Sequence, residues 1–149
     1  MSFGAHYAIQ AYAKVGVETG VSAADPHRLV LMLFEGAIAA VIDAKRHMTS
    51  GAVAAKGEAI SKAIMIVDDG LSASLDVDAG GALAQNLRAL YAYMSQRLLL
   101  AGAKNQPELL DEVRILLGEL KDAWASIKPQ AHAAASVQPT AAQTAPRPY

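Results

Sequence analysis

The chain has 149 residues, enough for one ordinary domain, and 13 Lys and Arg against 14 Asp and Glu give a net charge of -1. A nucleic-acid-binding protein usually carries a basic excess, so this balance argues against nucleic acid as a partner. The absence of cysteine excludes disulfides, thiolate metal sites and a cysteine nucleophile, and fits a reducing cytoplasm. Aromatic residues are only 5 % of the chain, and its many alanines and leucines favour an all-helical protein.

The N-terminal segment, residues 1–24, carries few charges, and Gly16 and Gly20 interrupt any long helix there. No basic residue precedes an apolar run in its first ten positions, as it would in a secretory signal. No strictly apolar run is longer than the six residues of 29–34, far fewer than the roughly 20 residues that a membrane span needs. We therefore expect an extended or irregular segment and no membrane insertion.

A first helix is predicted over residues 26–50. Asp25 can cap the free N–H groups of its first turn, Pro26 suits the first helical position, and Gly51 can close the helix. Apolar residues recur along it with helical spacing over an unusually wide arc. A second helix is predicted over 52–74, and the Asp- and Gly-rich stretch 76–81 then reads as a loop.

The third helix is predicted over 82–103 and the fourth over 107–128, where Pro129 stops it. Residues 129–149 hold too few large apolar groups to fold on their own. Four helices of similar length with short connections favour an all-α fold, the antiparallel up-down four-helix bundle. The predicted division is an N-terminal segment (1–24), a four-helix bundle domain (25–128) and a disordered Ala/Pro-rich tail (129–149).

Residues with the spacing of an active site are hard to find. The histidines do not lie three or four residues apart, and no Glu-x-x-His motif of di-iron bundles occurs. Asp76 and Asp78 begin like a calcium loop, but Gly80 occupies a ligand position and Leu87 stands where the bidentate glutamate should be. We expect no catalytic residue, no metal site and no cofactor, so the protein is predicted not to be an enzyme.

The feature that points to a function is apolar surface beyond what the core of a four-helix bundle needs. The first helix holds six consecutive apolar residues, and the third adds Tyr93, Leu99 and Leu100 outside its main stripe. Such residues can form a groove that accepts an amphipathic helix from a partner, or they can cap the bundle ends and lie scattered on the surface. An alternative function is a regulatory helical adaptor that homodimerises through this surface.

Several segments match, in order and spacing, those of a known family. They are Val17–Thr19, Pro26–Ala37, Lys56–Ala63, Gly80–Gly81, Ala84–Leu87, Leu90–Met94 and Leu110–Val113 with Trp124. Together they resemble the FliS family of flagellar export chaperones, over about residues 12–127. Phe34 stands where many members have Tyr.

The resemblance implies a small antiparallel helical bundle in the cytoplasm. It further implies that the protein binds the C-terminal segment of newly made flagellin, keeps it from polymerising early and delivers it to the flagellar export apparatus. In the family this segment wraps around the bundle, partly as helices in apolar grooves. The family's N-terminal segment can fold over the groove when flagellin is absent, and Tyr12 matches a tyrosine in that segment.

The predicted partner-binding surface comprises helix residues and N-terminal residues. The helix residues are Phe34, Ile64, Leu71, Asn86, Tyr91 and Tyr93. A tyrosine suits a half-wet groove because its ring buries while its hydroxyl stays hydrated, although Ile64, Leu71 and Tyr91 can instead belong to the bundle core. The N-terminal residues are Tyr12, Val15 and Val17. They are expected to be the apolar contacts of a movable cover; a permanently docked or frayed terminus is the alternative.

Overall fold

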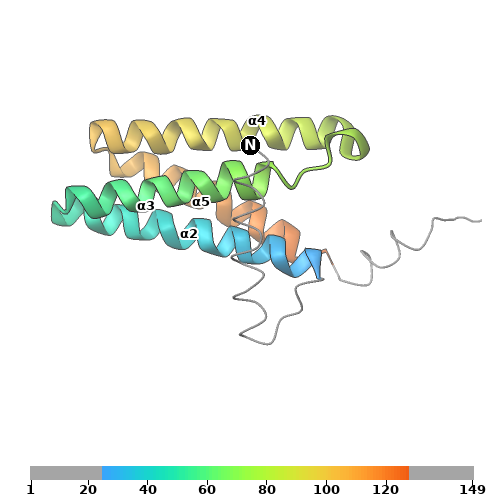
Figure 1. Ribbon diagram of the computed structural model, residues 1–149, viewed down its shortest axis with the longest axis horizontal. Helices are drawn as coiled ribbons and strands as arrows, with labels where there is room; N and C mark the ends of the chain where they lie inside the picture. Colours follow the sequence, from blue (N-terminus) through green and yellow to red (C-terminus); the bar gives the residue numbers. More distant parts are fainter. Residues whose placement is uncertain (1–24, 128–149) are drawn as a thin grey trace, which may run out of the picture.

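A computed structural model describes residues 25–127, which form four packed helices without a strand in that range (Figure 1). The elements are α2 (Pro26–Ser50), α3 (Val53–Met65), which continues as the π-helix η1 (Ile66–Ser72), α4 (Val77–Lys104) and α5 (Pro107–Ala125). Sequential helices run in opposite directions along the bundle. Each helix packs against the next, and α5 closes the ring by packing against α2. The predicted all-α bundle of four helices is confirmed.

The first helix begins and ends at the predicted residues. The Asp25 side chain accepts a hydrogen bond from the Arg28 N–H at 3.2 Å, and Pro26 occupies the first turn. Gly51 has a φ of 77° in the left-handed region, which a glycine adopts without steric cost, and its N–H caps the end of α2.

The second predicted helix is α3 together with η1. In η1 the backbone widens to a π-helix, and the buried residues Ile66, Val67 and Leu71 face the core. Gly70 permits close packing of η1 on α2, because a Cβ atom there would lie 3.0 Å from Cδ2 of Leu33. Helical periodicity in the sequence does not distinguish this π-helix from the α-helix before it.

The predicted loop over 76–81 is wrong in part. Residues 77–80 form a helical turn whose first N–H groups are capped by Asp76, and this side chain accepts from the Ala79 N–H at 3.0 Å. Gly81, with φ 57° and ψ -134°, then breaks the helical geometry inside α4. The fourth helix ends at Ala125, earlier than the predicted residue 128.

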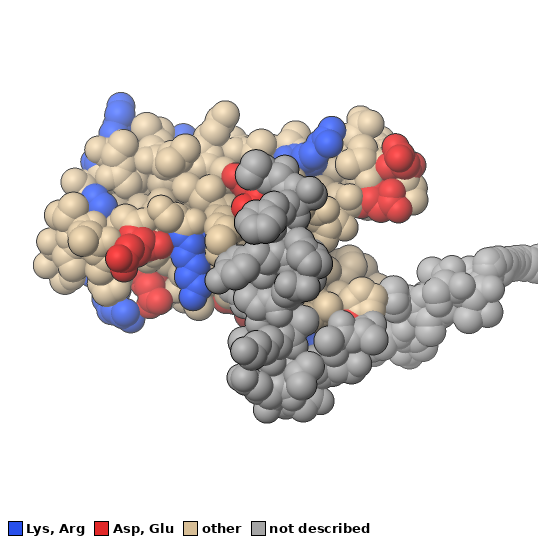
Figure 2. Space-filling model, viewed as in Figure 1, with Lys and Arg blue, Asp and Glu red and all other residues tan. Residues whose placement is uncertain are grey.

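The core lies between the four helices and is built almost wholly from aliphatic side chains and Met94. Its largest fully buried members are Leu33, Val41, Ile66, Val67, Leu71, Met94, Leu98, Leu110, Val113 and Leu117. Within residues 25–127, no helix is both long and apolar enough to span a bilayer. On the face shown in Figure 2, positive and negative side chains are interspersed.

Candidate functional site

An apolar groove lies at the end of the bundle where α2 begins and α5 ends. Its volume is about 430 Å3. It is lined by Val30, Phe34, Leu71, Ser74, Leu75, Asp76, Leu83, Leu87, Tyr91, Leu120, Ala123, Trp124 and Ile127. We call this set the end groove. All but Ser74 and Asp76 present mainly apolar surface, so the end groove is suited to an apolar ligand face.

The α4 wall of the end groove comes from one helical stripe. Leu83, Leu87 and Tyr91 are four residues apart, so their side chains follow one another along the same face. Leu83 is 68 % exposed, Leu87 is half-buried and Tyr91 is buried. Apolar surface therefore becomes more accessible toward the N-terminus of α4.

The opposite wall is held in place by a reciprocal contact between α2 and α5. The His27 Nε2–H donates to the Trp124 carbonyl at 2.9 Å, and the Trp124 Nε1–H donates to the His27 carbonyl at 2.9 Å. The two rings also stack, with centroids 5.1 Å apart and planes inclined by 17°. These contacts fix the Trp124 indole as a wall of the end groove.

The floor of the end groove is shared with the bundle core. Phe34, Leu71 and Tyr91 line the end groove, yet each belongs to the buried core cluster. Burial raises the pKa of Tyr91 to about 12, because water no longer stabilises the phenolate. Tyr91 is only 4 % exposed, so it belongs to the bundle core, the alternative named for it above, while it also lines the end groove.

The other predicted site residues lie elsewhere. Ile64 borders a separate hollow between α3, η1 and α4, together with Met65 and Leu99. Asn86 and Tyr93 are both exposed on α4, seven residues apart and therefore on one side of the helix. Tyr12, Val15 and Val17 fall outside the described residues.

Tyr93 takes part in an exposed polar network between α4 and α5. Its hydroxyl donates to one carboxylate oxygen of Glu112, and the Arg97 Nε–H donates to the other at 2.8 Å. The Arg97 guanidinium lies 5.5 Å from the Tyr93 ring centroid. The two hydrogen bonds, from Tyr93 first and then from Arg97, lower the pKa of Glu112.

Sequence reasoning missed several residues of the end groove as site residues. Leu83 and Leu87 lie in the apolar stripe of α4 and Trp124 in that of α5, and residues of such stripes are usually core residues. A stripe shows which residues share a helix face but not whether a neighbouring helix covers that face along its whole length. No pattern in the sequence marks where α4 and α5 leave their facing sides uncovered.

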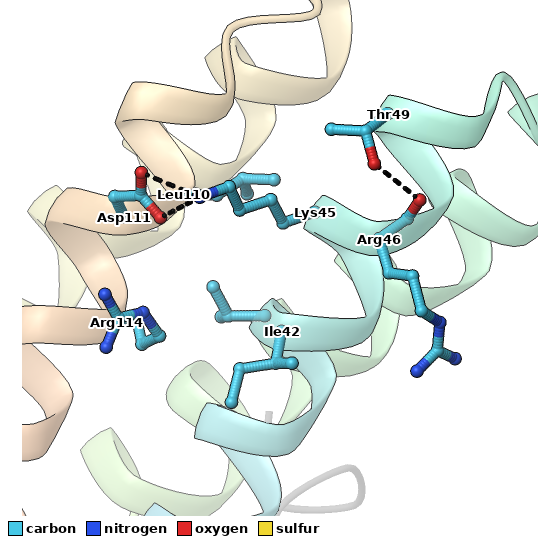
Figure 3. Close-up of a pocket in the computed structure, with 8 residues that line it drawn as sticks. Ile42, Lys45, Arg46, Thr49, Leu110, Asp111 and Arg114 are labelled. Atoms are coloured by element: carbon cyan, nitrogen blue, oxygen red, sulfur yellow. Dashed lines mark hydrogen bonds and ion pairs between the residues drawn. The ribbon is translucent and has the colours of Figure 1, made fainter.

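A second hollow lies between α2 and α5, toward the other end of α2 (Figure 3). The Lys45 ammonium and the Asp111 carboxylate bridge the two helices across it, with Nζ–O distances of 3.0 and 3.1 Å. Arg46 and Arg114 also line it, beside the apolar Ile42. Its mixed charged lining is less suited to an apolar helix face than the end groove is.

The chain is similar to known proteins over most of its length. The family model of the flagellar protein FliS matches residues 8–131. The flagellar secretion chaperone FliS of Salmonella typhimurium is 49 % identical over 123 residues, which cover 83 % of this chain and 91 % of the relative. FliS of Escherichia coli is 44 % identical, over 77 % of this chain and 85 % of its own length. FliS of Vibrio cholerae is 41 % identical, over 83 % of this chain and 90 % of its own length.

Proposed function

Since this chain belongs to the FliS family of flagellar secretion chaperones, we propose that it binds the C-terminal segment of newly made flagellin in the end groove. Binding keeps that segment from polymerising early, and the complex delivers flagellin to the flagellar export apparatus. A chaperone of this kind acts by binding, without a chemical step, so the protein is not an enzyme. We place the activity in the cytoplasm, where flagellin is made.

The observation that carries this proposal is the apolar, partly exposed lining of the end groove. An amphipathic helix laid into it covers Leu83, Leu87 and Trp124, and removes apolar surface from water on both partners. Each square ångström so buried contributes roughly 25 cal/mol. The same apolar faces of flagellin pack against other subunits in a filament, so their burial prevents polymerisation.

The flagellin segment reaches beyond the end groove in this proposal. A segment that orders on binding can follow a long surface, because the entropy lost on ordering is offset by apolar burial along its length. We therefore include the exposed side of α4 with Asn86 and Tyr93, and the hollow beside Ile64. Phe34, Leu71 and Tyr91 form the floor of the first part of this path.

Residues 1–24 act in this proposal as a movable cover of the bundle domain, with Tyr12, Val15 and Val17 as its apolar contacts. These residues lie outside the described range. Amide hydrogen exchange over residues 8–20 should become faster when the flagellin segment is added, because the ligand displaces the cover. Slower exchange would mean a clamp on the ligand, and unchanged exchange would contradict displacement.

The binding proposal is tested with two matched variants of the full chain. Leu83 lines the end groove and is 68 % exposed; Val53 is 71 % exposed on α3 and outside the groove. Leu83→Ala should weaken binding of the flagellin segment roughly tenfold, since a leucine contributes about 1.5–3 kcal/mol on full burial. Val53→Ala should bind like the wild type. Isothermal titration calorimetry measures both affinities.

Equal binding by Leu83→Ala and the wild type would contradict the placement of flagellin in the end groove. Absence of binding by the wild type would contradict the flagellin proposal itself. The adaptor alternative predicts homodimers without flagellin binding, whereas the chaperone proposal predicts a 1:1 complex. Light scattering on the eluted complex distinguishes these stoichiometries.

A further inference from the structure

We infer that the Tyr91 hydroxyl determines the specificity of the end groove, by donating a hydrogen bond to an acceptor that the bound flagellin segment carries in its apolar face. This inference rests on the proposed function, and it adds a chemical requirement for the ligand. If apolar burial were the sole contribution to binding, the end groove would bind any helix with an apolar face. A buried donor at the floor adds a preference for one that brings a matching oxygen atom.

Tyr91 is a buried residue with a polar end, and it lines the end groove. The residue is 4 % exposed, and its hydroxyl makes no hydrogen bond to any group within residues 25–127. Buried polar groups are almost always hydrogen-bonded, because an unpartnered donor loses its water without compensation. The buried hydroxyl of Ser95, four residues further along α4, follows this rule and donates to the Asp68 carboxylate at 2.6 Å.

Apart from Tyr91, the polar side chains that line the end groove each make a hydrogen bond within residues 25–127. The Ser74 hydroxyl donates to the Leu71 carbonyl at 2.9 Å, and the Asp76 side chain caps α4 through the Ala79 N–H. The Trp124 indole N–H, a donor in any case, is directed to the His27 carbonyl. None of these hydrogen bonds involves the Tyr91 hydroxyl.

The Tyr91 side chain lines the end groove, along which the ligand is proposed to lie. Long side chains on a helix lean toward its N-terminus, which for Tyr91 is the side of Leu87 and Leu83. These leucines are the accessible part of the α4 wall, so a helix that covers them passes close to Tyr91. The hydroxyl then lies between the groove floor and the apolar face of the ligand.

The chemistry of the acceptor follows from the helical form of the ligand. Backbone carbonyls inside a helix are already used in its own hydrogen bonds. The acceptor is therefore the side-chain oxygen of an Asn, Gln, Ser or Thr within the apolar face, or a free carbonyl in the last turn. A ligand with a wholly apolar face leaves the hydroxyl unpartnered and binds more weakly.

The test compares the wild type with Tyr91→Phe, which removes the hydroxyl and keeps the ring. The probe is the C-terminal segment of the flagellin of the same organism, titrated into the full chain. Tyr91→Phe should bind it about 2- to 12-fold more weakly, which is the range expected for one hydrogen bond. The free Tyr91→Phe protein should unfold at the same temperature as the wild type or higher, because no group within residues 25–127 pairs with the hydroxyl.

Ser95→Ala is the matched control, since it removes a buried hydroxyl that already has a partner. It should lower the unfolding temperature of the free protein, whereas Val53→Ala, outside the proposed path, should leave the affinity for flagellin unchanged. The acceptor is then located by replacing each polar residue of the flagellin segment with Ala. One replacement should weaken binding to the wild type but not to Tyr91→Phe, as a double-mutant cycle requires.

Two results would overturn the inference while leaving the proposed function intact. One is equal or tighter flagellin binding by Tyr91→Phe. The other is a lower unfolding temperature of the free Tyr91→Phe protein, which would mean that the hydroxyl already has a partner, for example in residues 1–24. Failure of the wild type to bind flagellin would instead overturn the proposed function and this inference together.

Discussion

Lys56 is buried, although lysine is among the residues least often found inside proteins. Its ammonium group donates to the Gly102 carbonyl at 3.1 Å and to the Asn105 side-chain oxygen at 2.7 Å. Both acceptors lie at the C-terminal end of α4, where free carbonyls and the helix dipole favour a cation. Lys56 on α3 thereby caps the C-terminal end of α4 and holds the two helix ends together.

Replacing Lys56 should test this contact directly. Lys56→Ala is expected to lower the free energy of unfolding by about 1–3 kcal/mol, because it leaves the Gly102 carbonyl without its donor. Lys62→Ala, on an exposed position of the same helix, should change it by less than about 0.5 kcal/mol. Urea denaturation measures both; equal stability of the two variants would contradict the capping role.

The pKa of Glu112 offers a second test at the residue scale. Tyr93→Phe removes the hydrogen bond that lowers this pKa most, so the pKa should rise toward the ordinary value of a glutamate. The lowered pKa means that the network stabilises the fold above the usual carboxyl range, and that this stabilisation is lost as the pH falls through the pKa of Glu112. Side-chain carboxyl NMR titration measures the pKa, and an unchanged value in Tyr93→Phe would contradict this assignment.

At the scale of the helices, the backbone path of α4 depends on Gly81, a residue that the sequence predicts only as part of a loop. The turn over residues 77–80 joins the rest of α4 through Gly81, whose φ of 57° and ψ of -134° suit glycine alone. Asp76 and Leu83, on either side of this break, both line the end groove. The break therefore shapes the rim of the candidate site.

Two glycine-to-alanine variants should have opposite effects on stability. Gly81→Ala is expected to cost about 1–3 kcal/mol, because a Cβ atom strains this backbone geometry. Gly57→Ala, inside α3 with open space around the new Cβ, should stabilise the fold by about 0.5–1 kcal/mol. Thermal unfolding measures both, and a neutral Gly81→Ala would show that the backbone there relaxes into an ordinary helix.

At the scale of the whole molecule, the division of the chain into 1–24, 25–128 and 129–149 remains a prediction. Limited proteolysis of the full chain should leave a core that ends near residues 127–129, because the sequence after Pro129 has few large apolar groups to anchor it. Mass spectrometry identifies the end of the fragment. A resistant fragment that retains residues 130–149 would contradict the predicted tail.

Local sequence features were enough to predict the four helices and the family. Asp25, Pro26 and Gly51 set the ends of α2 through local hydrogen bonds and backbone preferences, so no distant contact was needed to place them. Apolar stripes at helical spacing gave four helices, and short connections made neighbours of sequential helices. The ordered set of family segments indicated a flagellar chaperone, which the similarity to FliS proteins confirms.

The packing of the helices against one another separates the apolar residues of the core from those that line the end groove. Leu83 and Leu98 both lie in the apolar stripe of the third predicted helix, yet Leu83 is largely exposed and Leu98 is fully buried. The difference depends on which part of α4 the neighbouring helices cover, and that is set by packing between residues far apart in sequence. The contact between His27 and Trp124, 97 residues apart, is of the same kind. The apolar periodicity of one helix predicts neither the exposure of Leu83 nor the contact of His27 with Trp124, because both depend on how different helices pack together.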